Sequence, residues 1–208
     1  MSNLLVLTSS LGGEASVSNL LVEHAVSEFL AHSPRARVVR RDLATDTIPH
    51  LTPATVAGVR AEAETEAEHQ ARLLSETLIG ELRAADVIVI GAPMYNFSIP
   101  STLKAWFDHV LRAGVTFSYS EAGPKGLLDG KRVIVVEARG GLYSEGPAQA
   151  ADFQEAYLRH LLAFIGLTDV TFVRAEKIGF GPEARDAAIA AARAEIAGLA
   201  FHPEARAA

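Results

Sequence analysis

The chain has 208 residues, of which 49% are hydrophobic and 21% are charged, and its formal net charge at pH 7 is −6. This balance is typical of a soluble globular domain with a sizeable core, and the acidic charge argues against nucleic-acid binding. The chain has no cysteine, which excludes disulfides, thiolate catalysis and Cys-ligated zinc or iron–sulfur centres.

Strands and helices are predicted to alternate along the chain. Short apolar segments, typical of strands buried on both faces of a parallel sheet, occupy residues 4–7, 87–90 and 133–136. A fourth, at 170–173, is interrupted by Thr171, and two valines among the arginines of 37–41 predict a more exposed strand. Between these segments apolar residues recur at helical spacing, as in Val22, Val26 and Phe29, in Leu74, Leu78 and Leu82, and in Tyr157, Leu161 and Phe164.

This order ends with a helix over about 182–199, which Pro182 begins and whose first turn contains Glu183. Five strands alternating with helices predict an α/β fold, and the strand count favours the flavodoxin-like over the Rossmann version of the doubly wound sheet. We expect one domain over residues 1–208, with helices on both faces of a five-stranded parallel sheet. No segment has the features of a signal peptide or a membrane span, so we expect a cytoplasmic protein.

Two segments stay ambiguous. Residues 46–68 are rich in Thr and Glu and form either a mobile loop or an irregular approach to a helix. The glutamates at 62, 64, 66 and 68 are interpreted as a solvated segment. Residues 113–130 carry several glycines and two aromatics, and we expect a loop-like insertion there.

The loop after the first predicted strand, residues 9–19, contains four serines and leads into a helix. Hydroxyls and the free N–H groups of a helix N-terminus form an anion site, and the absence of Lys and Arg here means that dipoles would hold a phosphate. The segment matches neither the Walker A nor the G-x-G-x-x-G pattern. The alternative is a polar loop in which Ser18 caps the helix.

The loop after the third strand, residues 91–100, places Met94, Tyr95 and Phe97 between Pro93 and Pro100. A flat aromatic ligand would cover these side chains; alternatively, they pack beneath neighbouring helices. The loop after the fourth strand, residues 137–143, contains a glycine pair whose N–H groups could face a ring that gains negative charge on reduction, unless the glycines only serve a turn. Ligands bind at the carboxyl ends of parallel strands, so the three loops together predict one site.

Residues 92–97, Ala-Pro-Met-Tyr-Asn-Phe, resemble the signature of the FMN-dependent NADH-azoreductases, which are also quinone reductases. The similarity covers nearly the whole chain. It also includes residues 4–7 and 9–10, 16–19, Pro100, 103–108, 112–117, 123–124 with 126–127, 139–141, 164–166 and 168–170.

The resemblance implies a flavodoxin-like homodimer with one FMN per subunit near the dimer interface. It assigns to the phosphate and ribityl chain Ser10, Ser16, Val17 and Ser18. Along the isoalloxazine ring it places Met94, Tyr95, Asn96 and Phe97. At the pyrimidine edge it places Arg139, Gly140 and Gly141, with a backbone contact from Ala138. Ala138 stands where members of the family often carry a hydroxyl residue, so a side-chain hydrogen bond is lost there. Tyr143 stands where some members carry histidine, and this second difference bears on the preference for the electron acceptor. Pocket walls are implied at Phe117, Tyr119 and Phe164.

The expected reaction is a ping-pong transfer of two electrons, in which NADH or NADPH delivers a hydride and a quinone or azo compound then takes its place. The cofactor carries the chemistry, so we assign no catalytic side chain; Tyr143 either donates to an acceptor oxygen or has a packing role. The scattered histidines predict no metal site. Arg60 and Arg72 could meet the 2′-phosphate of NADPH. The alternatives are a flavodoxin-like electron carrier, an FMN-binding regulatory module and, last, a hydrolase, for which no G-x-S-x-G is present.

Overall fold

The computed structural model of the protein describes residues 2–121 and 123–201. Five parallel strands form the central sheet in the order β2-β1-β3-β6-β7. These strands are β1 (Asn3–Thr8), β2 (Arg37–Asp42), β3 (Val87–Pro93), β6 (Arg132–Ala138) and β7 (Asp169–Ala175). Counted along the chain, the parallel strands follow the order 2-1-3-4-5, which is the flavodoxin-like one, so the predicted sheet is confirmed.

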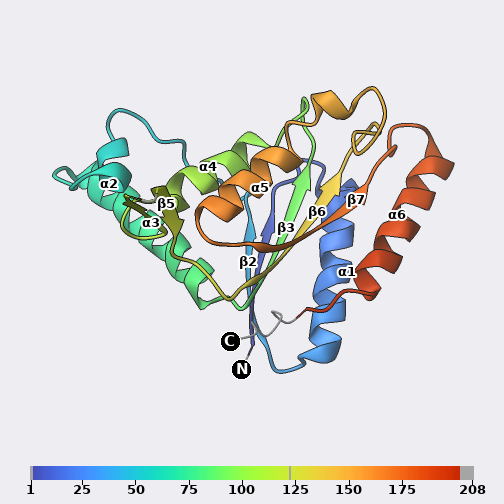
Figure 1. The fold of residues 1–208 in the computed structure, drawn as a ribbon, viewed down its shortest axis with the longest axis horizontal. Coiled ribbons are helices and arrows are strands. Elements are labelled where there is room, and N and C mark those ends of the chain that lie inside the picture. The colour runs from blue at the N-terminus through green and yellow to red at the C-terminus, as the bar shows by residue number, and fades with distance from the viewer. Residues whose placement is uncertain (1, 122, 202–208) are drawn as a thin grey trace.

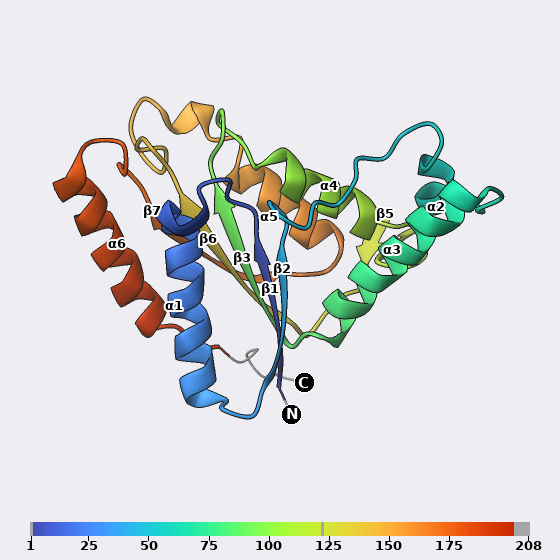
Figure 2. The same ribbon diagram turned by 180° about the vertical axis from the view of Figure 1, so that it is seen from behind.

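Helices cover both faces of this sheet (Figures 1 and 2). One face carries α1 (Val17–His32) and α6 (Pro182–Ala197), and the other carries α3 (Glu66–Ala84), α4 (Ser101–Val110) and α5 (Glu155–Phe164). The short α2 (Val56–Arg60) packs against α3, and two 3₁₀ turns lie at Gly13–Ala15 and Gln149–Ala151. In the part of the chain that is described, no helix is both long and apolar enough to cross a membrane.

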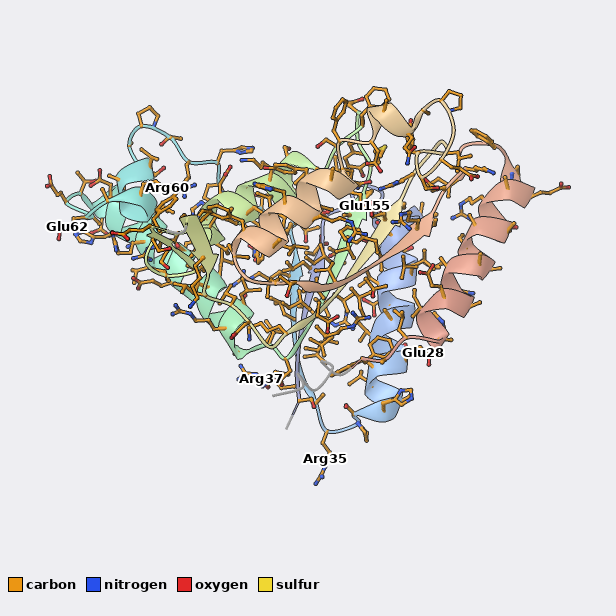
Figure 3. The ribbon with its side chains drawn as sticks, in the orientation of Figure 1. Glu28, Arg35, Arg37, Arg60, Glu62 and Glu155 are labelled. Carbon is orange, nitrogen blue, oxygen red and sulfur yellow. The ribbon has the colours of Figure 1, made fainter. Side chains whose placement is uncertain are left out.

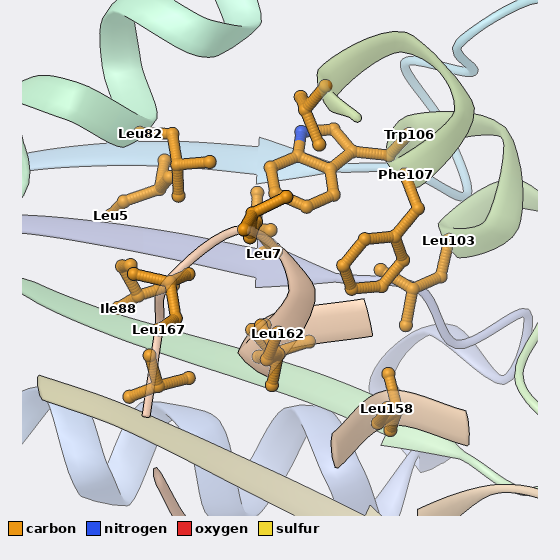
Figure 4. Packing of buried hydrophobic residues seen from close by; sticks show 14 of the residues in the cluster. Leu5, Leu7, Leu82, Ile88, Leu103, Trp106, Phe107, Leu158, Leu162 and Leu167 are labelled. Carbon is orange, nitrogen blue, oxygen red and sulfur yellow. The ribbon is translucent and has the colours of Figure 1, made fainter. Parts of the chain in front are cut away.

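The strands are continuously apolar because each contributes to two cores. In β1, Leu5 and Leu7 face the core beneath α3, α4 and α5, whereas Leu4 and Val6 face the core beneath α1 and α6. Figure 4 shows the first of these cores, in which Trp106 packs over the strands beside Phe107 and several leucines. β2 lies at the edge of the sheet and is only partly buried, as the arginine-rich segment predicts.

The predicted apolar stripe is correct for α1 and is shifted by one residue for α5. The stripe on α1 is confirmed, since Val22, Val26 and Phe29 are all buried. On α5 the prediction is off by one residue: Leu158 and Leu162 are fully buried, and the expected stripe is only partly buried beside them. Apolar residues stand next to each other at 157–158 and at 161–162, so helical spacing alone does not tell which member of each pair faces the core. The packing of α5 against the sheet decides it.

The two ambiguous segments both contain regular structure. Residues 46–55 are an irregular approach to α2, and α3 then begins after Thr65. Thr65 and Glu68 form a reciprocal capping box, so Glu68 has a structural role in addition to being exposed. The expected loop at 113–130 is wrong in its centre, where β4 (Phe117–Ser120) and β5 (Gly123–Gly126) form an antiparallel hairpin.

Candidate functional site

The three predicted loops meet at the carboxyl edge of the sheet because they follow β1, β3 and β6, which are neighbours. The Tyr95 hydroxyl accepts a hydrogen bond from the Leu11 N–H at 2.9 Å, which joins the serine loop to the aromatic loop. The Met94 N–H donates to the Ala138 carbonyl at 2.9 Å, which joins the aromatic loop to the glycine loop. The loops therefore form one continuous surface.

Two of these loops begin later than expected. β3 runs through Pro93 and β6 through Ala138, so Gly91 and Glu137 lie in strands. The two strand ends pair with each other, Gly91 with Val136 and Pro93 with Ala138. Pairing of residues far apart in sequence extends the strands beyond their apolar segments.

The serine loop presents hydroxyls and free backbone donors at the start of α1. Ser16 is the N-cap, and its Oγ accepts the Asn19 N–H at 3.1 Å and lies 3.1 Å from the Ser18 Oγ. The interpretation of Ser18 as the cap is therefore wrong; Ser18 is buried in the first turn. Within the described residues the N–H groups of Val17 and Ser18 have no acceptor, as expected for a first helical turn.

Ser10 completes this arrangement from the strand side. It is buried, its Oγ accepts the Gly12 N–H at 3.2 Å, and it lies 3.4 Å from the Tyr95 hydroxyl. Segment 9–19 thus supplies serine hydroxyls and a helix N-terminus without a basic residue, which is the donor set that suits a phosphate held by dipoles.

The aromatic loop is a tight turn with strained backbone. Tyr95 and Ser98 exchange two backbone hydrogen bonds, at 2.9 and 3.1 Å, and between them Asn96 has φ 48° and Phe97 has φ 72°. Positive φ is tolerated by asparagine but is unusual for phenylalanine. The Phe97 side chain is 49% exposed, so its packing beneath a helix, the alternative for this loop, is wrong.

The glycine loop turns its carbonyls inward and leaves its N–H groups free. The carbonyls of Arg139, Gly140 and Gly141 accept N–H groups from the segment 177–179, at 3.2, 3.0 and 2.8 Å. Neither the Gly140 nor the Gly141 N–H has an acceptor among residues 2–121 and 123–201. Tyr143 covers the loop, with its ring edge-on to Phe97 at a centroid distance of 6.1 Å.

The Arg139 side chain points away from this surface and is fully buried in an ionic cluster. Its guanidinium lies 2.6 Å from Glu137, 2.9 Å from Asp152 and 3.3 Å from Glu176. Burial alone would lower the Arg139 pKa, but the carboxylates of Glu137 and Asp152 outweigh burial and raise it. Only the backbone of Arg139 is therefore available at the site.

Two acids of this cluster have opposite pKa shifts. Burial raises the pKa of Glu137 from 4.5 to about 8, against the attraction of Arg139. Burial also acts on Glu176, but the Ser144 hydroxyl and the Tyr143 N–H outweigh it and hold the Glu176 pKa below its ordinary value. The sequence prediction did not single out Glu176; an acid directly after the last parallel strand is the one signal that indicates it.

The predicted pocket walls form a separate aromatic cluster. Phe117 lies 4.5 Å from Phe164 and 5.5 Å from Tyr119, measured between ring centroids. Phe164 ends α5, whereas Gln154, just before that helix, contacts the site through the Ala92 carbonyl. A 10-residue helix is about 15 Å long, so within one chain this cluster is distant from the three loops.

The arginines considered for a 2′-phosphate are engaged elsewhere. Arg60 donates to the carbonyls of Leu111 and Asp108, and Arg72 donates to the carbonyl of Ala61. Figure 3 shows Arg60 at the end of α2, well away from Glu155 at the start of α5. Both arginines thus stabilise backbone around α2 and α4.

Residues 2–199 match a family model described as a flavodoxin-like fold. The FMN-dependent NADH:quinone oxidoreductase of Hyphomonas neptunium is 62% identical to this chain and covers 96% of each chain. That of Ralstonia nicotianae is 55% identical, over 91% of this chain and 93% of its own length.

Two solved structures of azoreductases are also similar to this chain. An azoreductase from Bacillus anthracis has a TM-score of 0.87 with 30% identity, covering 95% of this chain and 97% of its own. An FMN-dependent NADH-azoreductase from Bacillus anthracis strain Ames Ancestor, in complex with FMN, has a TM-score of 0.83 with 25% identity, covering 94% and 98%.

Proposed function

Because the chain belongs to the family of FMN-dependent NADH:quinone oxidoreductases, which has the flavodoxin-like fold, we propose that it is an FMN-dependent enzyme that transfers two electrons from NADH to quinones and azo compounds. The observation that carries the site is the pair of free N–H groups at Gly140 and Gly141, which lie in the loop beside the aromatic turn 95–98. We also propose that residues 1–208 form a single FMN-binding domain.

The donor set supports FMN in three places. The hydroxyls of Ser10, Ser16 and Ser18 and the free N–H of Val17 suit its phosphate and ribityl chain. The turn from Met94 to Phe97 offers partly exposed apolar surface for a flat ring. The N–H groups of Gly140 and Gly141, with the backbone of Ala138 and Arg139, suit the polar edge of that ring.

When bound, FMN supplies reversible two-electron chemistry, with a hydride taken from the nicotinamide and two electrons passed to the acceptor. The protein binds and orients the reactants. The N–H groups of Gly140 and Gly141 stabilise negative charge at the pyrimidine edge with dipoles that are already in place. Phe97 and Tyr143 border the solvent-exposed side of the proposed flavin site, where they would orient the nicotinamide or the acceptor. We assign no side chain as general acid or base.

Ping-pong kinetics follow if NADH and the acceptor use one face in turn. Initial rates measured while both substrates are varied are then expected to give parallel double-reciprocal lines. Intersecting lines would show that both substrates are bound together and would contradict this part of the proposal. The engagement of Arg60 and Arg72 with backbone carbonyls supports NADH over NADPH, and we expect a higher kcat/KM for NADH.

A homodimer is proposed from the position of the aromatic cluster. Phe117, Tyr119 and Phe164 are distant from the three loops of their own chain, so they can wall the pocket only by facing the site of a second copy. Tyr119, 72% exposed, is available for such a contact. Sedimentation equilibrium is expected to give twice the chain mass; a monomer that turns over NADH and quinone would contradict this arrangement.

NADH is an intracellular metabolite, which supports a cytoplasmic location.

The test of the central proposal is the visible spectrum of the purified protein with added FMN, followed by anaerobic NADH. We expect protein-bound flavin bands that bleach with NADH and recover when a quinone is added. Binding without reduction by NADH would instead support the electron carrier or the regulatory module. Absence of flavin binding would contradict the assignment of all three loops.

A further inference from the structure

We propose that Glu176 and the Arg139 side chain are positioning residues, which together hold residues 139–144 so that the Gly140 and Gly141 N–H groups face the cofactor. The inference rests on the proposed function, since it takes FMN to lie at this edge. Neither side chain is required to touch FMN: Arg139 is fully buried, and the Glu176 carboxylate is engaged by the N–H groups of Tyr143 and Ser144.

The first support is the direction of the loop carbonyls. Three consecutive carbonyls, from Arg139 to Gly141, accept N–H groups of Lys177, Ile178 and Gly179. A peptide whose carbonyl points inward turns its N–H the other way, so this pairing aims the free donors outward. Lys177 adopts φ 62°, a left-handed conformation that reverses the chain directly after Glu176.

Gly179 brings the two segments close together. A Cβ at this position would lie 3.1 Å from the Gly140 carbonyl oxygen, which leaves little room for any side chain. The close approach explains a glycine here without reference to its φ angle. The segment that follows β7 therefore supports the glycine loop along its length.

The second support is that Glu176 binds both ends of this loop. One carboxylate oxygen accepts the N–H groups of Tyr143 and Ser144, at 2.8 and 3.0 Å, and lies 3.3 Å from the Arg139 guanidinium. The other oxygen accepts the Ser144 hydroxyl. The side chain is only 11% exposed, so these charge-assisted bonds are largely shielded from water.

The third support is that Arg139 connects the loop to the rest of the sheet edge. Its Nε donates to the Gln154 Oε1 at 3.1 Å, and the Gln154 amide donates to the Ala92 carbonyl at 2.8 Å. Its other nitrogens contact Glu137, Asp152 and Glu176. A lysine offers one point charge in place of this planar fork and could not hold all of these partners at once.

Buried ion pairs of this kind add little net stability, because desolvation of the charges offsets their attraction. The effect of the cluster is therefore expected on the geometry of the loop and on the cofactor it faces. This distinguishes a positioning role from a general contribution to folding.

The test compares Glu176→Gln with the unmodified full-length protein. The amide keeps the size of the side chain but loses the charge and one acceptor. In the apo-protein we expect hydrogen exchange at Tyr143 and Ser144 to accelerate about 10-fold or more. With FMN, we expect a weaker affinity, by about 10-fold, and a more negative two-electron midpoint potential, since the reduced flavin loses stabilisation by the two glycine N–H groups.

The matched control is Glu81→Gln. Glu81 also makes a partly buried bidentate pair, with Arg41, but on α3 and β2. It is expected to lower stability without changing exchange at Tyr143 and Ser144, FMN affinity or potential. If Glu176→Gln changes these quantities no more than Glu81→Gln does, the positioning role is wrong.

Failure of the inference and failure of the proposed function give different results. An unmodified protein that binds no FMN contradicts the proposed function itself. An unmodified protein that binds FMN, together with a Glu176→Gln variant of unchanged exchange, affinity and potential, contradicts only the positioning role. Should Glu176→Gln fail to fold, Ser144→Ala removes a single donor to Glu176; the same changes in smaller degree support the inference, and no change overturns it.

Discussion

Phe97 holds a backbone conformation that its own side chain disfavours. Its φ of 72° lies in the left-handed region, where a residue other than glycine or asparagine costs of the order of 1 kcal/mol or more. Strain of this kind is retained where the surrounding structure determines it, and here it lies in the turn proposed to line the flavin ring. The half-exposed ring lies edge-on to Tyr143, and the strained backbone turn sets its position.

Phe97→Gly is therefore expected to raise the free energy of unfolding of the apo-protein by about 1 kcal/mol, and to weaken FMN binding. Phe97→Ala is the control, since it removes the same ring but keeps a Cβ in the strained conformation. Urea unfolding and FMN titration of both variants are the measurements. A Phe97→Gly variant less stable than Phe97→Ala, the result expected when glycine only adds freedom to the unfolded chain, would show that the turn is not strained.

Glu137 gives a pH dependence whose sign can be worked out. Its pKa rises from 4.5 to about 8 on folding, chiefly because of burial, so the folded chain keeps a proton that the unfolded chain releases. The stability that this proton contributes is fully present below pH 4.5 and is lost as the pH rises through about 8.

We expect Glu137→Gln, which cannot ionise, to flatten the fall in stability between pH 5 and 9. The measurement is the urea midpoint of both proteins at several pH values. Groups that are not coupled to Glu137 contribute equally to both proteins, so the difference between them reports the titration of Glu137 and its ionic partners. A constant difference across this range would mean that Glu137 is ionised throughout.

At the scale of elements, the strands of the parallel sheet are predictable because burial on both faces makes them continuously apolar. The β4–β5 hairpin is not, since most of its side chains are at least partly exposed and carry no such pattern. The ends of β3 and β6 are also missed, because they depend on pairing between strands distant in sequence. The same limit applies to Glu176 and Gln154, whose roles depend on contacts with residues that are distant in sequence at the carboxyl edge of the sheet.

The three loops could be predicted, since each follows directly after an apolar strand and parallel strands bring their carboxyl ends together. What each serine does could not, because the choice between Ser16 and Ser18 as the cap depends on where α1 begins. The Arg139 side chain, too, has no signal in the sequence that separates an inward from an outward orientation.

The start of α1 provides a test at this scale. Ser16→Ala removes an N-cap and is expected to cost about 1 kcal/mol of stability, and also to weaken binding of FMN without an equal effect on riboflavin, which lacks the phosphate. The control is Thr65→Ala, which removes the cap of α3 at a similar cost in stability but away from the site. Calorimetric titration with both flavins separates the two effects; equal losses for FMN and riboflavin would contradict a phosphate at Ser16.

For the whole molecule, the site exists only when the strands are in the order observed. β1, β3 and β6 stand side by side although long stretches of the chain, residues 9–86 and 94–131, separate them in sequence. A ligand that contacts all three loops therefore stabilises the entire fold and not one segment of it.

FMN at 100 times its Kd is accordingly expected to add about 2.7 kcal/mol to the free energy of unfolding, which for a chain of this size raises Tm by roughly 5–10 °C. Thermal unfolding followed by circular dichroism over a range of FMN concentrations checks this. The transition is expected to stay single while it moves to higher temperature. A second transition that does not respond to FMN would show that part of the chain folds independently of the site.

The pairing of residues 139–141 with residues 177–179 also sets the order of events during synthesis. At about 5–20 residues per second, the ribosome releases the serine, aromatic and glycine loops several seconds before the segment that fixes the last of them. A nascent chain that lacks β7 has every proposed FMN contact of the three loops but cannot hold its glycine loop in place. Uptake of the yellow cofactor would therefore mark chains whose translation has passed this segment, and stalled or truncated products would remain colourless.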